Sequence, residues 1–242
     1  LARFPLRGLF SIAGIAAAMG ILLVSQHFLD AVEALLEHEL ATARRYDLAV
    51  TFFEPQHGRT VAELASIEGV LMVEPQRQLA VRFLAGPVRE LGAITGLLPD
   101  ARLDRILDAD GQALAVPEDG LVLSLALAQK LGVGRGDVLL VEVLEGRRPM
   151  LELHVAGVVE TYLGTTAFMD LEAMARALKE APQPGAARLT VDPLAEARVI
   201  AALQERPEVA GVNRRQAFID SFRATVGETI HIVTGFYVLF AS

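Results

Sequence analysis

Two stretches far apart in the chain, ELASIEGVLMVEPQRQ at residues 63–78 and ALQERPEVAGVNRRQ at residues 202–216, share one order of features. Each passes from the end of an amphipathic segment through a short break into a valine-rich run, which is typical of a helix followed by a strand. A shorter run rich in β-formers precedes each helix, at Tyr46–Phe53 and at Ala187–Val191. Two strand–helix–strand units can pair in one sheet layer, so we expect an α+β domain of the ferredoxin-like type.

The local signals within these two units predict where their helices begin and end. In the first unit we expect a helix from Thr60 to Ile67, with Glu63 completing a capping box and Gly69 stopping it. In the second unit Asp192-Pro193 is typical of a helix start, because Asp favours the N-cap and Pro the first helical position.

The residues between the two units, 88–185, have a different sequence pattern. They predict a small β-rich subdomain inserted into the α+β domain. Alternating runs joined by turn residues indicate a hairpin, and short helices are expected after Ser124 and Asp170. The string Ala181-Pro182-Gln183-Pro184-Gly185 is typical of a linker. The outer domain is therefore expected in two parts, residues 46–87 and 186–214, around this insertion.

The stretch GLFSIAGIAAAMGILLVSQHFL, residues 8–29, carries no charged side chain. As a helix it is long enough for a bilayer core of ~30 Å, and helix is the form in which a single segment satisfies its own backbone there. Arg3 and Arg7 precede it, whereas Asp30 and Glu33 follow it, so the positive-inside rule puts the N-terminus in the cytoplasm. A secretory signal peptide and a buried core helix are the alternatives.

The segments that flank the outer domain predict how it is joined to the membrane. Amphipathic patterns at residues 30–45 and 215–228 indicate two stalk helices. Residues 229–242 are uncharged and too few to span a bilayer, so we expect the truncated start of a second transmembrane helix. A hydrophobic core helix is the alternative there. We therefore expect a fragment of a longer protein, with residues 1–29 as cytoplasmic flank and transmembrane helix.

Composition excludes several classes of function. The net charge of −8 argues against nucleic-acid binding, which needs a basic face. The chain has no cysteine, which excludes disulfides, cysteine zinc sites and thiol catalysis. The membrane ends hold most of the excess hydrophobicity, so what lies between them is expected to be an ordinary folded domain.

No motif in the sequence predicts catalysis, a cofactor or a metal. The glycine cluster at residues 132–136 follows a helix and precedes a strand, the reverse of a dinucleotide fingerprint, so it indicates a helix stop and turn. Asp108-Ala109-Asp110-Gly111 resembles the start of a calcium loop, but Ala113 stands at the glycine position and Asp119 at the glutamate position. Ser124 lacks the glycines of a nucleophile elbow and is expected to cap a helix. The five histidines, none at metal-ligand spacing, are His27, His38, His57, His154 and His231. His231 and its neighbour Glu228 are interpreted as membrane-boundary residues.

The order of these segments resembles the FtsX/MacB-like permeases of ABC transporters. The likeness is carried by short motifs spread over nearly the whole chain: Arg3-Phe4-Pro5-Leu6-Arg7 before the span, Arg45-Tyr46-Asp47-Leu48-Ala49-Val50, the stretch from Leu64 to Glu74-Pro75, Gly120-Leu121-Val122-Leu123-Ser124, Leu131-Gly132-Val133-Gly134-Arg135-Gly136-Asp137, and the strand Leu151–Val159.

The resemblance implies a MacB-type outer domain on a permease subunit of the cell (inner) membrane, with residues 30–228 on the periplasmic or extracellular side. It implies a non-enzymatic protein that works as a homo- or heterodimer with a separate cytoplasmic ABC ATPase, whose hydrolysis of ATP moves the outer domain in export, lipoprotein handling or mechanotransmission. The alternative is a membrane-tethered extracytoplasmic sensor or adhesion domain without transport activity. A membrane-bound hydrolase is the third possibility, and it lacks a polar constellation.

Overall fold

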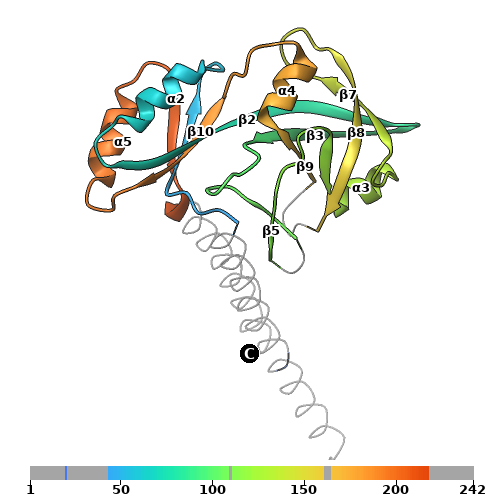
Figure 1. Ribbon diagram of the computed structural model, residues 1–242, viewed down its shortest axis with the longest axis horizontal. Helices are drawn as coiled ribbons and strands as arrows, with labels where there is room; N and C mark the ends of the chain where they lie inside the picture. The colour runs from blue at the N-terminus through green and yellow to red at the C-terminus, as the bar shows by residue number, and fades with distance from the viewer. Residues whose placement is uncertain (1–19, 21–42, 109–110, 161–164, 218–242) are drawn as a thin grey trace, which may run out of the picture. The chain divides into compact units, whose positions relative to one another are not determined.

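The computed structural model describes residue 20 and residues 43–108, 111–160 and 165–217 (Figure 1). Contacts within the chain define a compact unit from Leu40 to Arg215, to which the following description applies. Apart from residue 20, the transmembrane segments expected at 8–29 and 229–242 lie outside the described residues, as do nearly all of the two expected stalks. Within the described ranges, no helix has the length and apolar character needed to cross a bilayer.

The unit combines strands with short helices, as an α+β fold does. In chain order they are β1 Leu48–Phe52, α2 Gly58–Ala65, β2 Val70–Ala85, β3 Val88–Leu97, β4 Ile106–Leu107, β5 Ala113–Leu114, β6 Leu121–Ser124, α3 Leu125–Leu131, β7 Val138–Val143, β8 Met150–Val159, β9 Thr166–Asp170, α4 Leu171–Leu178, β10 Ala186–Val191, α5 Glu196–Gln204 and β11 Val209–Arg214.

The two strand–helix–strand units expected from the sequence form one sheet. Its strand order is β11-β1-β10-β2, with antiparallel neighbours throughout. Strand β10 of the second unit thus inserts between β1 and β2 of the first, which is the ferredoxin-like arrangement. We call this part, residues 43–76 and 181–215, the sheet lobe.

Helices α2 and α5 lie together over one face of this sheet (Figure 1). Alternate strand residues such as Leu48, Val50 and Leu189 point toward them and are fully buried. They pack with Leu64 of α2 and with Val199 of α5 in a single apolar cluster. The apolar residues that recur with the helical period of 3.6 and those that recur with the strand period of 2 therefore pack in one core, which explains the apolar patterns of the helices and strands in the sequence.

The remaining strands close into a barrel, except β4 and β5, which form a separate two-stranded sheet. Strand β2 continues past the sheet lobe and pairs with β3, and the pairing then runs through β9, β6, β8 and β7. Strand β7 pairs back with β2 at Val81–Leu84, so the ring has no free edge there. We call this part, residues 77–180, the barrel lobe. It contains the β-rich region expected from the sequence, and the second half of β2 joins that region to the sheet lobe.

The barrel interior is filled by side chains rather than open. Inward residues of the strands, Phe83, Leu123 and Val141 among them, are fully buried. Leu127 of α3 and Met174 of α4 complete the same cluster. This cluster shares no residue with the core of the sheet lobe, so each lobe has its own hydrophobic core.

The hairpin of β2 and β3 was not anticipated as such from the sequence. Its two-residue loop is Gly86-Pro87, and Gly86 has a φ of +57°, as tight hairpin turns with a glycine at the first position require. The expected boundary between residues 87 and 88 falls in this hairpin. Strand β2 also runs through Pro75, whose missing N–H is tolerated because residues 70–76 of β2 pair with β10 alone.

Two expected helix starts are wrong. Helix α2 begins at Gly58 with His57 as its N-cap, and Glu63 pairs with arginines instead of closing a capping box with Thr60. It ends at Ala65 rather than at Ile67. Helix α5 begins at Glu196, because the Asp192 carboxylate accepts a hydrogen bond from Leu194 N in a turn that precedes the helix. Local hydrogen-bonding turns compete with helix N-caps for the same residue types.

Candidate functional site

The chain enters and leaves the sheet lobe at neighbouring positions. Leu48 at the start of β1 lies opposite Arg214 at the end of β11. Arg215 N donates a hydrogen bond of 3.0 Å to Asp47 O, and Asp47 N donates one of 2.8 Å to Leu189 O. The Asp47 carboxylate accepts a third bond, 3.0 Å from Val191 N. Asp47 therefore fixes the incoming and outgoing chain to β10, the strand beside β1.

A loop of the barrel lobe is attached to the incoming chain. We call residues 101–105 the tie loop and residues 43–47 the incoming segment. Arg45 N donates to Leu103 O at 2.7 Å, and Arg105 N donates to Ala43 O at 2.9 Å. These bonds form an antiparallel bridge between Arg44 and Asp104. The incoming segment therefore contacts the barrel lobe before it reaches β1.

The other edge of the tie loop is held by Glu74 of β2. The Glu74 carboxylate accepts hydrogen bonds from Arg102 N at 2.8 Å and Leu103 N at 2.9 Å. Glu74 is 8% exposed. Bonds from two amides to one buried carboxylate are charge-assisted, so they are stronger than bonds between neutral groups. This explains how a carboxylate is accommodated in the middle of a strand.

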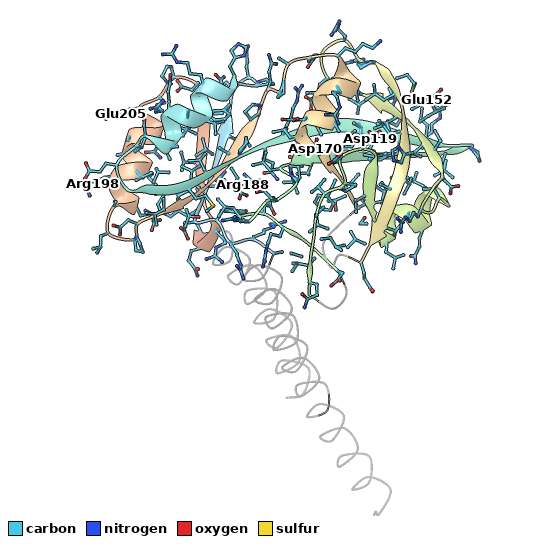
Figure 2. The ribbon with its side chains drawn as sticks, in the orientation of Figure 1. Asp119, Glu152, Asp170, Arg188, Arg198 and Glu205 are labelled. Atoms are coloured by element: carbon cyan, nitrogen blue, oxygen red, sulfur yellow. The ribbon has the colours of Figure 1, made fainter. Side chains whose placement is uncertain are left out.

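Asp104 of the tie loop faces two residues of the sheet lobe. Its Oδ2 accepts a hydrogen bond of 3.0 Å from Gln76 Nε2 and lies 3.6 Å from Nε of Arg188. The Arg188 guanidinium is stacked over the ring of Tyr46, 4.9 Å from its centroid. Arg188, on β10, is labelled near the centre of Figure 2. Tyr46 belongs to the incoming segment, so this contact joins all three parts of the site.

Positive charge gathers on the side of the tie loop that meets the incoming segment. Burial lowers the pKa of the Arg105 guanidinium from its usual value, and the nearby charge of Arg45 lowers it further. Both effects disfavour the charged form. An arginine guanidinium nevertheless stays protonated in proteins, so Arg105 keeps its positive charge.

The site is therefore a junction, formed by the incoming segment, the tie loop, Glu74, Gln76 and Arg188. Its contacts are structural: backbone hydrogen bonds and ion pairs hold the incoming segment to both lobes. Within the described ranges, no group of three or more His, Asp or Glu residues is arranged to hold a metal ion.

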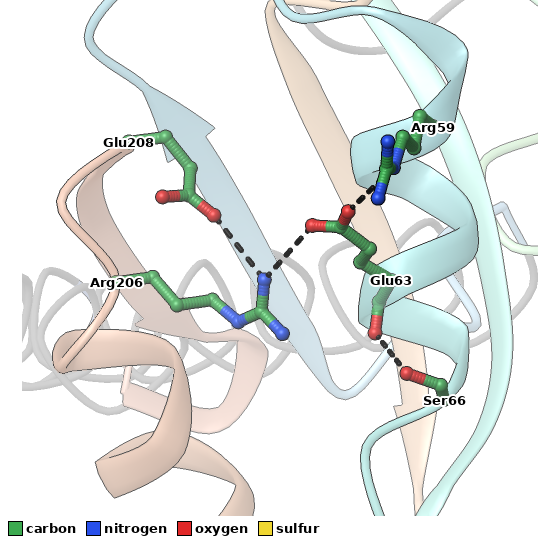
Figure 3. Close-up of polar contacts among 5 residues, drawn as sticks. All are labelled: Arg59, Glu63, Ser66, Arg206 and Glu208. Carbon is green, nitrogen blue, oxygen red and sulfur yellow. Dashed lines mark hydrogen bonds and ion pairs between the residues drawn. The ribbon is translucent and has the colours of Figure 1, made fainter.

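A second polar network lies away from the junction, between α2 and the chain that follows α5 (Figure 3). Glu63 lies 3.1 Å from Arg59 Nε and 3.6 Å from Arg206 Nη1. Arg206 also pairs with Glu208 at 3.2 Å, and Ser66 Oγ donates to Glu63 O. All of these residues belong to the sheet lobe, so the network joins α2 to the segment that follows α5 and does not involve the barrel lobe.

The residues singled out in the sequence have structural places in the described unit. Gly132 ends α3 with a left-handed φ of +66°, and Gly136 N donates to Val155 O in the turn into β7. Ser124 caps α3 through a bond from Leu127 N. Asp108 accepts from Gln112 N in the β4–β5 turn.

The histidines of the described unit also have structural places. His57 is the N-cap of α2, and the ring of His154 lies against Gly120. His27, His38, His231 and Glu228 lie outside the described residues. None of the candidate residues that are described is part of the junction.

Sequence reasoning did not find the junction. Its one local signal is Glu74, a charged residue that directly follows the apolar run Val70–Val73 in a segment predicted to be extended. A carboxylate at such a position needs a partner, because burying an unpaired charge is costly. Its partners, the backbone amides of Arg102 and Leu103, lie 28 and 29 positions further along the chain, in a loop where nothing in the sequence distinguishes them.

Known proteins match this chain in structure but not in sequence. No protein-family model matches the sequence. No curated protein matches it either. Among solved structures, the periplasmic region of MacB from Actinobacillus actinomycetemcomitans matches with a TM-score of 0.50 and 10% identity, covering 78% of this chain and 98% of that one.

Two further structures match at lower TM-scores. The extracellular domain of the noncanonic ABC-type transporter YknZ from Gram-positive bacteria gives 0.44 at 11% identity, over 62% of this chain and 88% of that one. A domain of a putative permease protein from Porphyromonas gingivalis gives 0.39 at 15% identity, over 68% of this chain and 80% of that one.

The match to MacB includes nearly all of that periplasmic region, in which a chain of very different sequence has the same arrangement of elements. The fold implied by the resemblance to FtsX/MacB-like permeases is thus confirmed: the described domain has the fold of the periplasmic region of MacB.

Proposed function

We propose that the chain is a permease subunit of an FtsX/MacB-type ABC transporter, in which ATP hydrolysis by a separate cytoplasmic ATPase moves the extracytoplasmic domain. In this proposal residues 8–29 span the cell (inner) membrane, residues 30–228 lie on the periplasmic or extracellular side, and two permeases form a homo- or heterodimer. The chain itself carries out no chemistry. The movement of the domain serves export, lipoprotein handling or mechanotransmission.

The observation that carries the proposal is the junction. The chain enters at Arg44–Asp47 and leaves at Arg215, and Arg215 N bonds to Asp47 O. Uncharged segments lie beyond both points in the sequence, at 8–29 and 229–242. A relative displacement of these two connections would act at one place, where the tie loop also connects to the barrel lobe. Rigid elements joined at such a point can transmit movement as whole bodies.

The orientation is tested with single cysteines, because residues 1–242 contain none. Arg147, in the turn between β7 and β8, has a side chain that is 74% exposed. We expect an R147C variant to react with a membrane-impermeant maleimide in intact cells (spheroplasts for a double-membrane species). The matched control, A2C, should react only after lysis. Labelling of R147C only after lysis would contradict the proposed topology.

The partner is tested by purifying the full-length protein from its own cells in mild detergent. We expect an ABC ATPase to co-purify. We also expect the distance between spin labels at E152C in the barrel lobes of the two permeases to change when ATP and vanadate are added. ADP serves as the control for nucleotide binding without turnover. Purification without any ATPase would reject the transporter and favour the sensor or adhesion alternative.

A further inference from the structure

We propose that the contact between the tie loop and the sheet lobe is a releasable catch, which holds the two lobes at a fixed angle and opens about a hinge at Gln76-Arg77. The catch is formed by Glu74, Gln76 and Arg188 on the sheet lobe, and by residues 102–104 of the tie loop. It goes beyond the proposed function, because it is a conformational property of the domain with or without an ATPase.

The lobes are separate bodies joined by few covalent connections. Their hydrophobic cores have no member in common. The chain crosses between them at Gln76-Arg77 in β2 and again where α4 is followed by residues 180–185. A contact without a shared apolar core lacks the largest favourable term in folding, so its strength depends on the polar groups at its surface.

The hinge is placed by the pairing of β2. Strand β10 pairs with β2 up to Gln76, and strand β3 pairs with it from Arg77 onward. The second crossing meets the first at this point, because Gly185 N donates a bond of 3.0 Å to Gln76 O. Both covalent connections therefore pass through one small region, about which one lobe can rotate against the other.

The tie loop is attached differently on its two sides. Toward the barrel lobe, the residues that flank it are apolar: Leu97 and Ile106 are buried in a cluster with Val122 and Val159, against which Ala101 of the loop itself packs. Toward the sheet lobe, the loop makes polar contacts with the carboxylate of Glu74, with the side chains of Gln76 and Arg188, and with the backbone of the incoming segment. The apolar side holds the loop to the barrel, whereas the polar side exchanges its hydrogen bonds for bonds to water when it opens, so the net free energy that keeps it closed is much smaller than the gross strength of those bonds.

The geometry of the polar side also favours release. The Arg188 Nε and the Asp104 carboxylate are 3.6 Å apart, an ion pair without a hydrogen bond, and Gln76 Oε1 is buried without a hydrogen-bond partner. The closed contact therefore does not satisfy every polar group it buries. Two arrangements of such an interface can be close in free energy, and a load on the incoming segment biases the choice between them.

The experiment measures the angle between the lobes directly. Arg198 of α5 and Glu152 of β8 are exposed and lie on the sheet lobe and the barrel lobe, respectively (Figure 2). Spin labels at R198C/E152C in the full chain in detergent report the distance between lobes by pulsed electron resonance. We expect one narrow distance distribution when the catch is intact.

Removing the charges of the catch should broaden that distribution. The E74Q/D104N pair keeps the shape of both side chains but removes both negative charges, so we expect a broader distribution or a second distance. The amides of Arg102 and Leu103 should exchange with solvent at least ~10-fold faster. The matched control, E208Q, removes a carboxylate from the Arg206 pair within the sheet lobe (Figure 3) and should leave the distance unchanged.

Two outcomes overturn the catch. The distance distribution of E74Q/D104N could coincide with that of the parent in a sample whose circular dichroism shows an intact fold. Alternatively, E208Q could broaden it equally, which would indicate general loosening. If the double variant does not fold, E74Q alone is measured with the same labels, since a glutamine oxygen still accepts one of the two amide bonds. These results do not involve the ATPase, so failure of the catch and failure of the transporter proposal are told apart.

Discussion

Ser124 is fully buried in the barrel lobe, yet its hydroxyl oxygen has two backbone donors. Leu127 N donates to it at 3.3 Å as the cap of α3, and Thr166 N donates at 3.1 Å from the neighbouring strand β9. We expect Ser124→Ala to lower the free energy of unfolding by about 2 kcal/mol, because both amides lose their acceptor in a site that water does not reach. Denaturant unfolding followed by circular dichroism measures it.

Ser66→Ala is the matched control at the residue scale. The Ser66 hydroxyl donates a bond of 2.7 Å to Glu63 O, but it lies at an exposed helix end where water can replace it. Its cost should stay within about 0.5 kcal/mol. If both substitutions lower the free energy of unfolding by the same amount, burial of the Ser124 hydroxyl does not increase its contribution to stability.

At the scale of elements, helix α2 lacks the cap that α3 and α4 have. Ser124 and Asp170 accept bonds from the third residue of their helices, whereas His57 has the right extended backbone and makes no side-chain bond. We expect His57→Asp to raise the stability by about 0.5–1 kcal/mol, since a carboxylate at the N-cap accepts an amide and faces the positive end of the helix. Thermal unfolding measures the gain.

His57→Ala is the control for this change. It removes a side chain that makes no capping bond, so the stability should be nearly unchanged. A loss similar in size to the gain from aspartate would show that the imidazole already contributes at this position, and would refute the uncapped start of α2.

The elements also show how far local sequence determines this fold. The hairpin of β7 and β8, the caps at Ser124 and Asp170 and the glycine stop at Gly132 were predicted, because each depends on neighbouring residues. The start of α5 was predicted three residues too early, since the Asp192 carboxylate is used by a turn that looks like a cap in sequence.

What could not be predicted is the pairing between distant segments. The closure of β7 on β2 and the bond of Glu74 to Arg102 depend on which chain segment arrives beside which strand. Strand alternation indicates that a residue faces inward, but it does not identify the neighbour. The junction consists entirely of such distant contacts, and this is why the sequence pointed to the two lobes and not to the contacts that connect them.

At the scale of the whole molecule, two separate cores on one continuous strand predict two units of local stability. Leu189 is fully buried in the sheet lobe and Leu139 is fully buried in the barrel lobe. Leu189→Ala should cost about 2–5 kcal/mol in its own core through lost contacts and a residual cavity. Native-state hydrogen exchange should then show lower protection in β1, β10 and β11, with β6 and β8 unchanged.

Leu139→Ala is the reciprocal variant, and it should lower protection in β6, β7 and β8 while β1 and β10 stay as they are.

Strand β2 is the informative element, because its residues 70–76 pair with β10 and its residues 77–85 pair with β3 and β7. Each substitution should therefore affect one half of β2, with the change falling at Gln76-Arg77. If either variant lowers protection evenly along the whole of β2 and across both lobes, the domain unfolds as one body and the two cores are not independent. A division within a single strand would instead mean that one lobe can loosen or rotate while the other keeps its structure, which is the property a force-transmitting domain needs.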